Sequence, residues 1–395
     1  MPASPWTLDD AERAEALDLL SALVCIPSPD PPGDEAAVAA FLAGWLTEHG
    51  FDTETDEFAP GRVNVLTRVA SGDVPALVFS AHMDTMPAGA DTAAWTHDPF
   101  GAEVADGKLY GRGAADMKSG LAAMAAAALK LKRAGARLAG DVILAFSAGE
   151  SSSGLGAKRM VERGDLAGAG ALLVSEPSSL EVLVAETGAL WLEVTATGTT
   201  GHASAGGGDN AIVKLMDVLA DLRDEPFAGH AHPLLGPATL AINTIGGGTA
   251  VNLTPDRAQA TLDIRTVPGM VTADVLSTLD AFAAGRAAFA VIDDKPPVVT
   301  DPAEPFVALC RDAVARVRGD GPTVDDLSQE VAAEAAGVRY FSDSCVLAPA
   351  LEVPRVIVGP GEAGMSGQRD EWVAVDAVCE AAAIFAETAA AYLSR

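Results

Sequence analysis

The sequence predicts an α/β protein in which a smaller α+β domain is inserted into a larger one. The 395 residues are too many for one small hydrophobic core, which favours two domains. Strand-like and helical segments alternate near both ends of the chain, as they do in a sheet covered by helices. The middle of the chain has a different pattern. Because the first pattern resumes after it, an inserted domain fits better than two consecutive domains.

The first region, from residue 10 to about residue 185, combines short apolar runs with segments of helical spacing. The acidic N-terminal segment, residues 1–20, is also helical in pattern. The expected strands are 75–81, 141–148 and 171–177, and the expected helices are 117–134 and 154–164.

The middle region opens at residue 190, where apolar and polar residues alternate as in a strand with one buried face. Helices are expected to cover one face of its sheet. Its expected strands are 190–198, 238–248, 258–267 and 288–292, and its expected helices are 210–224 and 272–285. The last region returns to the first pattern, with expected helices at 305–317, 328–336 and 373–393 and a strand at 354–358.

Composition excludes several classes of protein. The chain has 26 basic and 55 acidic residues, a net charge of −29, which repels nucleic acid and anionic membranes. No apolar stretch is long enough for a membrane span, and the N-terminus lacks the basic and apolar regions of a signal peptide. The 4 cysteines are scattered without CxxC spacing, which favours structural thiols in a reducing compartment. We therefore expect a cytoplasmic protein without nucleic-acid or membrane partners.

Polar side chains follow the first expected strand in the stretch SAHMDT, 80–85. His82 and Asp84 lie two residues apart, so they share a face of an extended chain. A metal-binding imidazole usually needs a carboxylate on its other nitrogen, and Asp84 could supply it. The alternative is a surface pair that binds no metal.

The stretch YGRGAADMKSG, 110–120, places Asp116 after glycines that permit a tight loop. Asp116 then opens an expected helix, where aspartate readily serves as an N-cap. The local sequence leaves open whether Asp116 caps this helix or binds a metal.

Two glutamates follow two further strands. Glu150 lies in SAGESSSGLGA, 147–157, and Glu176 lies in LVSEPSSL, 173–180. An unpaired charge is costly at a buried strand end, so Glu150 is either hydrogen-bonded or chemically active. With His82 at the end of a third strand, these acids converge where open α/β sheets bind ligands.

The inserted region contributes two further candidates. His202 lies in the Gly-rich stretch GTTGHASAGGGDNAI, 198–212, where a solvated loop histidine would be unremarkable. Arg265 ends a strand and is either a surface charge or a clamp for an anion.

Together these stretches resemble the zinc-dependent aminoacylase and carboxypeptidase family that includes acetylornithine deacetylase, succinyl-diaminopimelate desuccinylase and glutamate carboxypeptidase. They occur in family order across nearly the whole chain. The resemblance implies a catalytic domain, 1–187 and 298–395, with a mixed, mostly parallel sheet between helices. A smaller α+β lid domain, 188–297, interrupts it. Because this lid commonly mediates dimerisation in the family, we expect a homodimer.

The family binds paired metals on five side chains, and the resemblance assigns three of them here. His82 and Glu176 match ligands of one metal, and Asp116 matches the aspartate that bridges both metals. Zinc is the expected metal, and imidazole with carboxylates would also accept cobalt or manganese.

Both ligands exclusive to the second metal are missing. The second acid of the family's Glu-Glu pair falls on Ser151, and the histidine that follows Gly-Pro-Gly falls on Gly367. The spacing of that loop is undisturbed and all 6 histidines lie upstream, so a shifted alignment restores neither ligand. His82, Asp116 and Glu176 still provide three donors, the usual number for a catalytic zinc with an open position. The sequence therefore predicts a one-metal site.

The resemblance also assigns catalytic and substrate-binding roles. Glu150 matches the family's general base, and Asp84 beside the histidine ligand is a further catalytic candidate. His202 resembles the lid histidine that stabilises the oxyanion, often from the partner subunit. Arg265 and Asn243 resemble lid residues that hold the carboxylate of a small-molecule substrate.

Arg369 stands where the family usually has proline, two residues beyond the vacated ligand position at Gly367. Its charge could offset part of the missing positive charge, and an exposed loop arginine is the alternative.

The favoured function is that of a metal-dependent amidohydrolase acting on an N-acyl amino acid or small peptide with one metal ion. One rival is a repurposed enzyme that uses a single metal for amide formation, isomerisation or elimination. Another is a catalytically silent binding protein. Retention of Glu150 and His202 speaks against the silent protein, but it does not separate the two kinds of enzyme.

Overall fold

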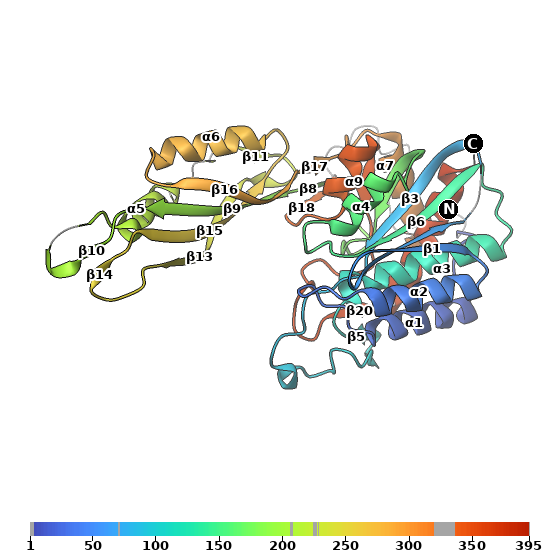
Figure 1. The fold of residues 1–395 in the computed structure, drawn as a ribbon. Helices are drawn as coiled ribbons and strands as arrows, with labels where there is room; N and C mark the ends of the chain where they lie inside the picture. The colour runs from blue at the N-terminus through green and yellow to red at the C-terminus, as the bar shows by residue number, and fades with distance from the viewer. Residues whose placement is uncertain are drawn as a thin grey trace. The chain divides into compact units, whose positions relative to one another are not determined.

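The computed structural model describes residues 4–69, 72–205, 208–223, 227, 229–319 and 336–394. The chain forms two compact units (Figure 1), unit 1 with Met1–Val184, Thr300–Ala336 and Ser342–Arg395, and unit 2 with Ala185–Val299 and Gly337–Phe341. The predicted inserted domain, 188–297, lies within the Ala185–Val299 part of unit 2, which also takes in Gly337–Phe341. The Phe341 ring lies edge-on to Trp191, with ring centroids 6.0 Å apart.

Unit 1 is built on a mixed sheet with the strand order β1-β2-β6-β3-β7-β19-β8. Its central strands β6, β3, β7 and β19 are parallel, and the pairs on either side of them are antiparallel. The strands are β1 (Asp52–Ala59), β2 (Arg62–Arg68), β3 (Val74–His82), β6 (Gly140–Ser147), β7 (Ala169–Val174), β8 (Leu183–Glu186) and β19 (Arg355–Ile357). This arrangement confirms the predicted α/β class with a mixed sheet.

Helices cover both faces of this sheet, with α4 and α9 opposite α1, α2 and α3 (Figure 1). The central strands are apolar along their length because both faces are buried. Helix α3 is Ala-rich, and its small side chains are almost all buried, partly against α10. The helices are α1 (Asp10–Val24), α2 (Ala36–Glu48), α3 (Ser119–Arg133), α4 (Leu155–Arg163), α7 (Pro305–Arg318), α9 (Ser344–Leu351) and α10 (Val375–Tyr392).

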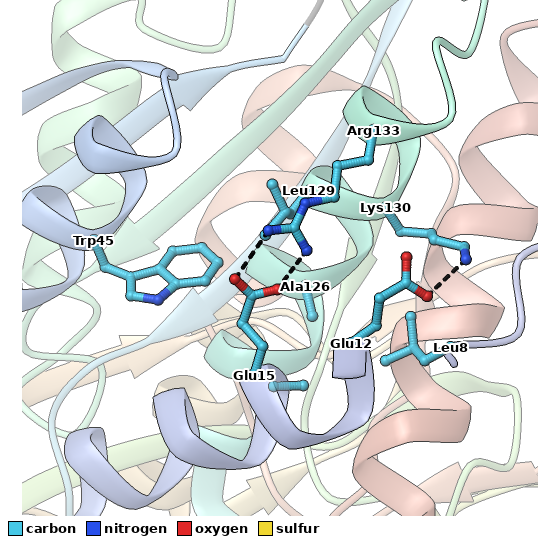
Figure 2. Close-up of a pocket in the computed structure, with 9 residues that line it drawn as sticks. Leu8, Glu12, Glu15, Trp45, Ala126, Leu129, Lys130 and Arg133 are labelled. Carbon is cyan, nitrogen blue, oxygen red and sulfur yellow. Dashed lines mark hydrogen bonds and ion pairs between the residues drawn. The ribbon is translucent and has the colours of Figure 1, made fainter. Parts of the chain in front are cut away.

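Two ion pairs connect α1 with α3 next to Trp45 of α2 (Figure 2). Lys130 Nζ donates to Glu12 at 2.7 Å, and Arg133 binds both carboxylate oxygens of Glu15. The charged side chains that line the pocket at this place already have partners, so we interpret it as a junction between helices.

Short elements complete unit 1 next to the sheet. A three-stranded sheet has the order β20-β5-β4. The short elements are η1 (Thr92–Ala94), β4 (Val104–Ala105), β5 (Lys108–Tyr110), the turn η2 (Ala114–Lys118) and β20 (Trp372–Ala374).

Unit 2 has a four-stranded antiparallel sheet with the order β13-β15-β9-β16. Alternate residues of β9 and β15 form its core with the apolar sides of α5 and α6, as the predicted one-sided α+β domain requires. The main elements are β9 (Gly188–Thr197), α5 (Ala211–Arg223), β13 (Thr239–Gly247), β15 (Arg257–Thr266), α6 (Thr272–Ala283) and β16 (Ala288–Lys295). The short ones are β10 (Gly201–His202), η3 (Ala203–Ala205), β11 (Ala231–His232), β12 (Gly236–Pro237), β14 (Leu253–Thr254) and β17 (Val298–Val299).

Most predicted elements are confirmed to within a few residues at their ends. The helix predicted at 328–336 lies outside the described residues except for Ala336, which opens strand β18 (Ala336–Val338). Within the described ranges, no helix is both long and apolar enough to cross a membrane.

Candidate metal and catalytic site

The candidate site lies at the carboxyl ends of the parallel strands in unit 1. His82 is the last residue of β3, the strand between β6 and β7. Glu150 follows the end of β6, and Glu176 follows the end of β7. Because parallel strands end at the same edge of a sheet, their first loop residues meet there.

Three side chains form a set that could hold a metal ion. One ligand atom from each of His82, Asp116 and Glu176 lies within 4.8 Å of the others. The His82 Nδ1 donates to the backbone carbonyl of Asp84 at 2.9 Å, which leaves Nε2 facing Asp116 and Glu176. Nε2 lies 3.1 Å from Asp116 Oδ1 and 3.7 Å from Glu176 Oε1.

The electrostatics of this set suit a cation. Burial disfavours the charged form of His82, but the carboxylates of Asp84, Asp116 and Glu176 raise its pKa well above the ordinary histidine value. The surroundings of Nε2 therefore stabilise positive charge. An imidazole nitrogen facing two carboxylate oxygens is a donor set that zinc accepts, so these residues fit the expected metal.

Asp116 does not cap a helix. Its backbone is extended, with φ −127° and ψ 94°, and helix α3 begins three residues later at Ser119. Its carboxylate faces His82, and its other oxygen accepts a hydrogen bond from Ser366. The N-cap interpretation was wrong because the chain turns sharply before the helix and directs this side chain to the strand ends.

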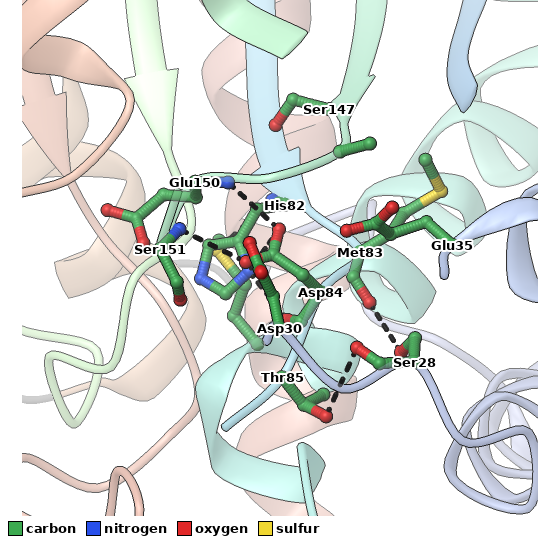
Figure 3. Close-up of polar contacts among 12 residues, drawn as sticks. Ser28, Asp30, Glu35, His82, Met83, Asp84, Thr85, Ser147, Glu150 and Ser151 are labelled. Carbon is green, nitrogen blue, oxygen red and sulfur yellow. Dashed lines mark hydrogen bonds and ion pairs between the residues drawn. The ribbon is translucent and has the colours of Figure 1, made fainter. Parts of the chain in front are cut away.

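The Asp84 carboxylate supports the loop that carries Glu150 (Figure 3). It accepts the backbone N–H of Glu150 at 3.0 Å and that of Ser151 at 3.1 Å. Its Oδ1 lies 3.7 Å from His82 Nδ1, beyond hydrogen-bond distance. The expected carboxylate contact to the histidine is thus replaced by the Asp84 backbone carbonyl.

Glu150 is buried beside this set of donors. Burial raises its pKa well above the ordinary glutamate value, and the charge of His82 partly opposes the shift. The carboxylates of Asp343, Asp84 and Asp116 raise the pKa further. A raised pKa brings a carboxyl group toward the range in which general acid–base catalysis operates, which is compatible with the predicted role of Glu150 as the base.

Among the residues that the structure describes, no metal-binding side chain takes over at either of the two positions where the family's ligands are missing, Ser151 and Gly367. Ser151 contributes its backbone N–H to Asp84. Gly367 has φ +70°, and a Cβ built there would meet only Met86 Cγ, at 3.8 Å. Arg369 is exposed, and in the described part of the chain its guanidinium has no ion pair, so its role as a substitute charge stays a prediction.

A different arginine lies beside the vacated position. Buried Arg112 donates to Glu371 at 2.6 Å and to the Gly367 carbonyl at 3.2 Å. Glu371 Oε1 accepts the backbone N–H groups of Ala115 and Asp116, each at 3.0 Å. Sequence reasoning missed this contact because its partners are 259 residues apart. Arg112 lies in the quoted stretch YGRGAADMKSG, and Glu371 lies a few residues after the loop that follows Gly-Pro-Gly, but neither position signals the contact.

A second acidic cluster consists of Asp30, Glu35 and Asp84 (Figure 3). Arg62 occupies it, with two bonds of 3.0 Å to Asp30 and one of 2.6 Å to Glu35. Arg62 also donates to Ser152 at 3.2 Å, in the loop that follows Glu150. A guanidinium therefore supplies the cation that this cluster needs.

The remaining sequence candidates belong to unit 2. His202 is exposed, and its Nδ1 bonds to the Ser204 hydroxyl at 2.7 Å. Asn243 is exposed at the irregularity between Ile242 and Thr244, where the β13–β15 register shifts. Arg265 Nη2 donates to Asp263 at 2.9 Å. Their roles toward a substrate stay predictions.

Comparison with known proteins agrees with the predicted family. The model of peptidase family M20/M25/M40 matches residues 78–391. A succinyl-diaminopimelate desuccinylase of Methylorubrum populi is 32% identical over 358 residues, 83% of this chain and 88% of that protein. One of Parvibaculum lavamentivorans is 34% identical over 280 residues, 67% of each chain.

Solved structures show the same fold. The M20 family metallo-carboxypeptidase Sso-CP2 from Sulfolobus solfataricus superposes with a TM-score of 0.81 at 18% identity, over 98% of this chain and 100% of that one. The YXEP protein of Bacillus subtilis, a dinuclear metal-binding peptidase from the M20 family, gives 0.72 at 19% identity, over 98% and 99%. With the sequence match, these likenesses make the chain a member of peptidase family M20/M25/M40 and an enzyme of the metallopeptidase and amidohydrolase type.

Proposed function

We propose that this enzyme is a zinc-dependent amidohydrolase that uses one metal ion to cleave the amide bond of an N-acyl amino acid or small peptide. The observation that carries the proposal is the set of His82, Asp116 and Glu176, gathered within 4.8 Å at the strand ends beside buried Glu150. Cobalt or manganese would suit the same donors.

The chain's own residues divide the work of hydrolysis. His82, Asp116 and Glu176 would hold the ion, which when bound supplies Lewis acidity toward the amide carbonyl and the attacking water. Glu150 takes a proton from that water and delivers it to the leaving nitrogen. Asp84 holds the backbone of Glu150 by the 3.0 Å bond, so the base keeps its place beside the donor set.

The substrate is a small molecule with a carboxylate. Arg265 and Asn243 would hold that carboxylate, and His202 would donate to the developing oxyanion. Because the curated relatives are desuccinylases, N-succinyl amino acids are the first compounds to test.

We further propose a cytoplasmic homodimer joined through unit 2. The edge strands of the unit 2 sheet expose large apolar side chains, Ile242 and Ile245 on β13 and Val291 and Ile292 on β16. Apolar side chains gathered on sheet edges favour association with another surface. Light scattering of the purified chain, with an Ile245→Lys variant for comparison, tests this oligomeric state.

The decisive experiment measures metal content and products together. Zinc-loaded protein is analysed for metal per chain and incubated with N-succinyl amino acids, N-acetyl amino acids and dipeptides. One tightly held equivalent with release of the free amine supports the proposal. Two tightly held equivalents would end the one-metal site.

The absence of metal-binding side chains at Ser151 and Gly367 favours one rival, an enzyme with a non-hydrolytic reaction. Folded protein with one bound zinc but no cleavage of any compound would support that rival.

A further inference from the structure

The two oxygens of the Asp116 carboxylate have different partners. Oδ1 lies 3.1 Å from His82 Nε2, on the side of the donor set. Oδ2 accepts a hydrogen bond from the hydroxyl of Ser366. In the family that this chain resembles, the matching aspartate bridges two metals, so each oxygen there carries an ion.

The loop that carries Ser366 is tied to Asp116 at several points. Arg112 donates to the carbonyl of Gly367, the next residue, and also to Glu371 at the end of the loop. Glu371 in turn accepts the backbone N–H of Asp116 at 3.0 Å. The buried ion pair of Arg112 and Glu371 and these backbone contacts therefore hold the loop in the position from which the Ser366 hydroxyl reaches Oδ2.

A second ion at Oδ2 would have to displace the Ser366 hydroxyl, and the hydrogen bond between this hydroxyl and Asp116 would be lost. The neighbouring positions offer it no side-chain donor of the usual kind, because they hold Ser151 and Gly367. We infer that Ser366 is a positioning residue whose hydroxyl takes the place of a second metal on Asp116 and directs its other oxygen to a single ion. This inference rests on the proposed metal-dependent function.

The inference predicts a change in metal affinity. Partners that orient a ligand typically change affinity 10- to 100-fold when removed, so Ser366→Ala should weaken zinc binding roughly 10-fold or more. Ser366→Thr keeps a hydroxyl and, because the side chain is exposed, should keep the affinity of the unaltered protein. Gln368→Ala, an exposed change in the same loop, is the matched control.

Zinc affinity is measured by competition with a chromophoric chelator, and thermal unfolding of the chelated proteins verifies that each variant folds. Weaker binding by Ser366→Ala, with Ser366→Thr and Gln368→Ala unchanged, supports the inference. Equal affinity for Ser366→Ala and the unaltered protein overturns the inference and leaves the proposed function standing. An unaltered protein that binds no divalent metal overturns both.

Discussion

Replacing Glu35 by glutamine should make the protein less sensitive to pH. The Glu35 carboxyl is fully buried and accepts one hydrogen bond from Arg62, at 2.6 Å. Burial, followed by the charge of Asp84, raises its pKa from 4.5 to about 7, although Arg62 opposes the shift. Glutamine keeps an oxygen for Arg62 and has no charge to bury.

The direction of the pH dependence follows from whether the folded or the unfolded protein binds the proton of Glu35. Between the unfolded pKa of 4.5 and the folded pKa of about 7, folded Glu35 is protonated and unfolded Glu35 is not. Folding therefore takes up a proton in this window, and the free energy of unfolding falls as the pH rises. The difference between the two pKa values corresponds to roughly 3 kcal/mol, of which about 2 kcal/mol lies between about pH 5 and about pH 7.5.

Urea unfolding at these two pH values, with a chelator present so that metal binding adds no pH dependence, measures the effect. The free energy of unfolding of the unaltered protein should fall by about 2 kcal/mol more than that of Glu35→Gln when the pH is raised from the lower to the higher value. Glu48→Gln, at the exposed end of helix α2, for which Glu35 is the N-cap residue, makes the same chemical change in water and is the control. If Glu35→Gln changes the free energy of unfolding by the same amount at both pH values, the carboxyl is not protonated in the folded state and the reasoning fails.

Three further changes test the site. Glu150→Gln should lower kcat by roughly 100- to 10,000-fold with zinc content unchanged, because an amide cannot take the proton; full activity would remove Glu150 as the base. Arg62→Met should lower the free energy of unfolding by about 3–5 kcal/mol, because buried Asp30 would lose its cation and Glu35 would lose its hydrogen-bond donor. An unchanged urea midpoint would contradict that. His202→Ala should lower kcat about 100-fold with zinc affinity retained, whereas a rise in KM alone would indicate ground-state binding.

The sequence predicted the elements whose apolar pattern is strong. Strands β3, β6 and β7 are continuous apolar runs, and β15 alternates cleanly, so each was predicted within a few residues. The pair β1–β2 was not predicted, because DTETDEFA of β1 is polar and only half-buried. Strand β5 was missed because it is only three residues long and depends on pairing with β20.

Only part of the candidate site could be predicted from the sequence, because some of its contacts join residues far apart in the chain. His82, Glu150 and Glu176 follow apolar strands, so their meeting at one sheet edge could be expected from the chain alone. The contacts of Ser366 and Arg112 could not, because they join residues that are 250 and 259 positions apart and no local pattern specifies them.

Charge favours the proposed single ion at these residues. A single dication balances the carboxylates of Asp116 and Glu176, and His82 contributes a neutral nitrogen, so the loaded set has no net charge. A second dication would need further negative charge in a buried place, and the position that supplies it in the family is Ser151. In the proposed one-metal site, the hydroxyl of Ser366 therefore satisfies the Asp116 oxygen that does not face His82.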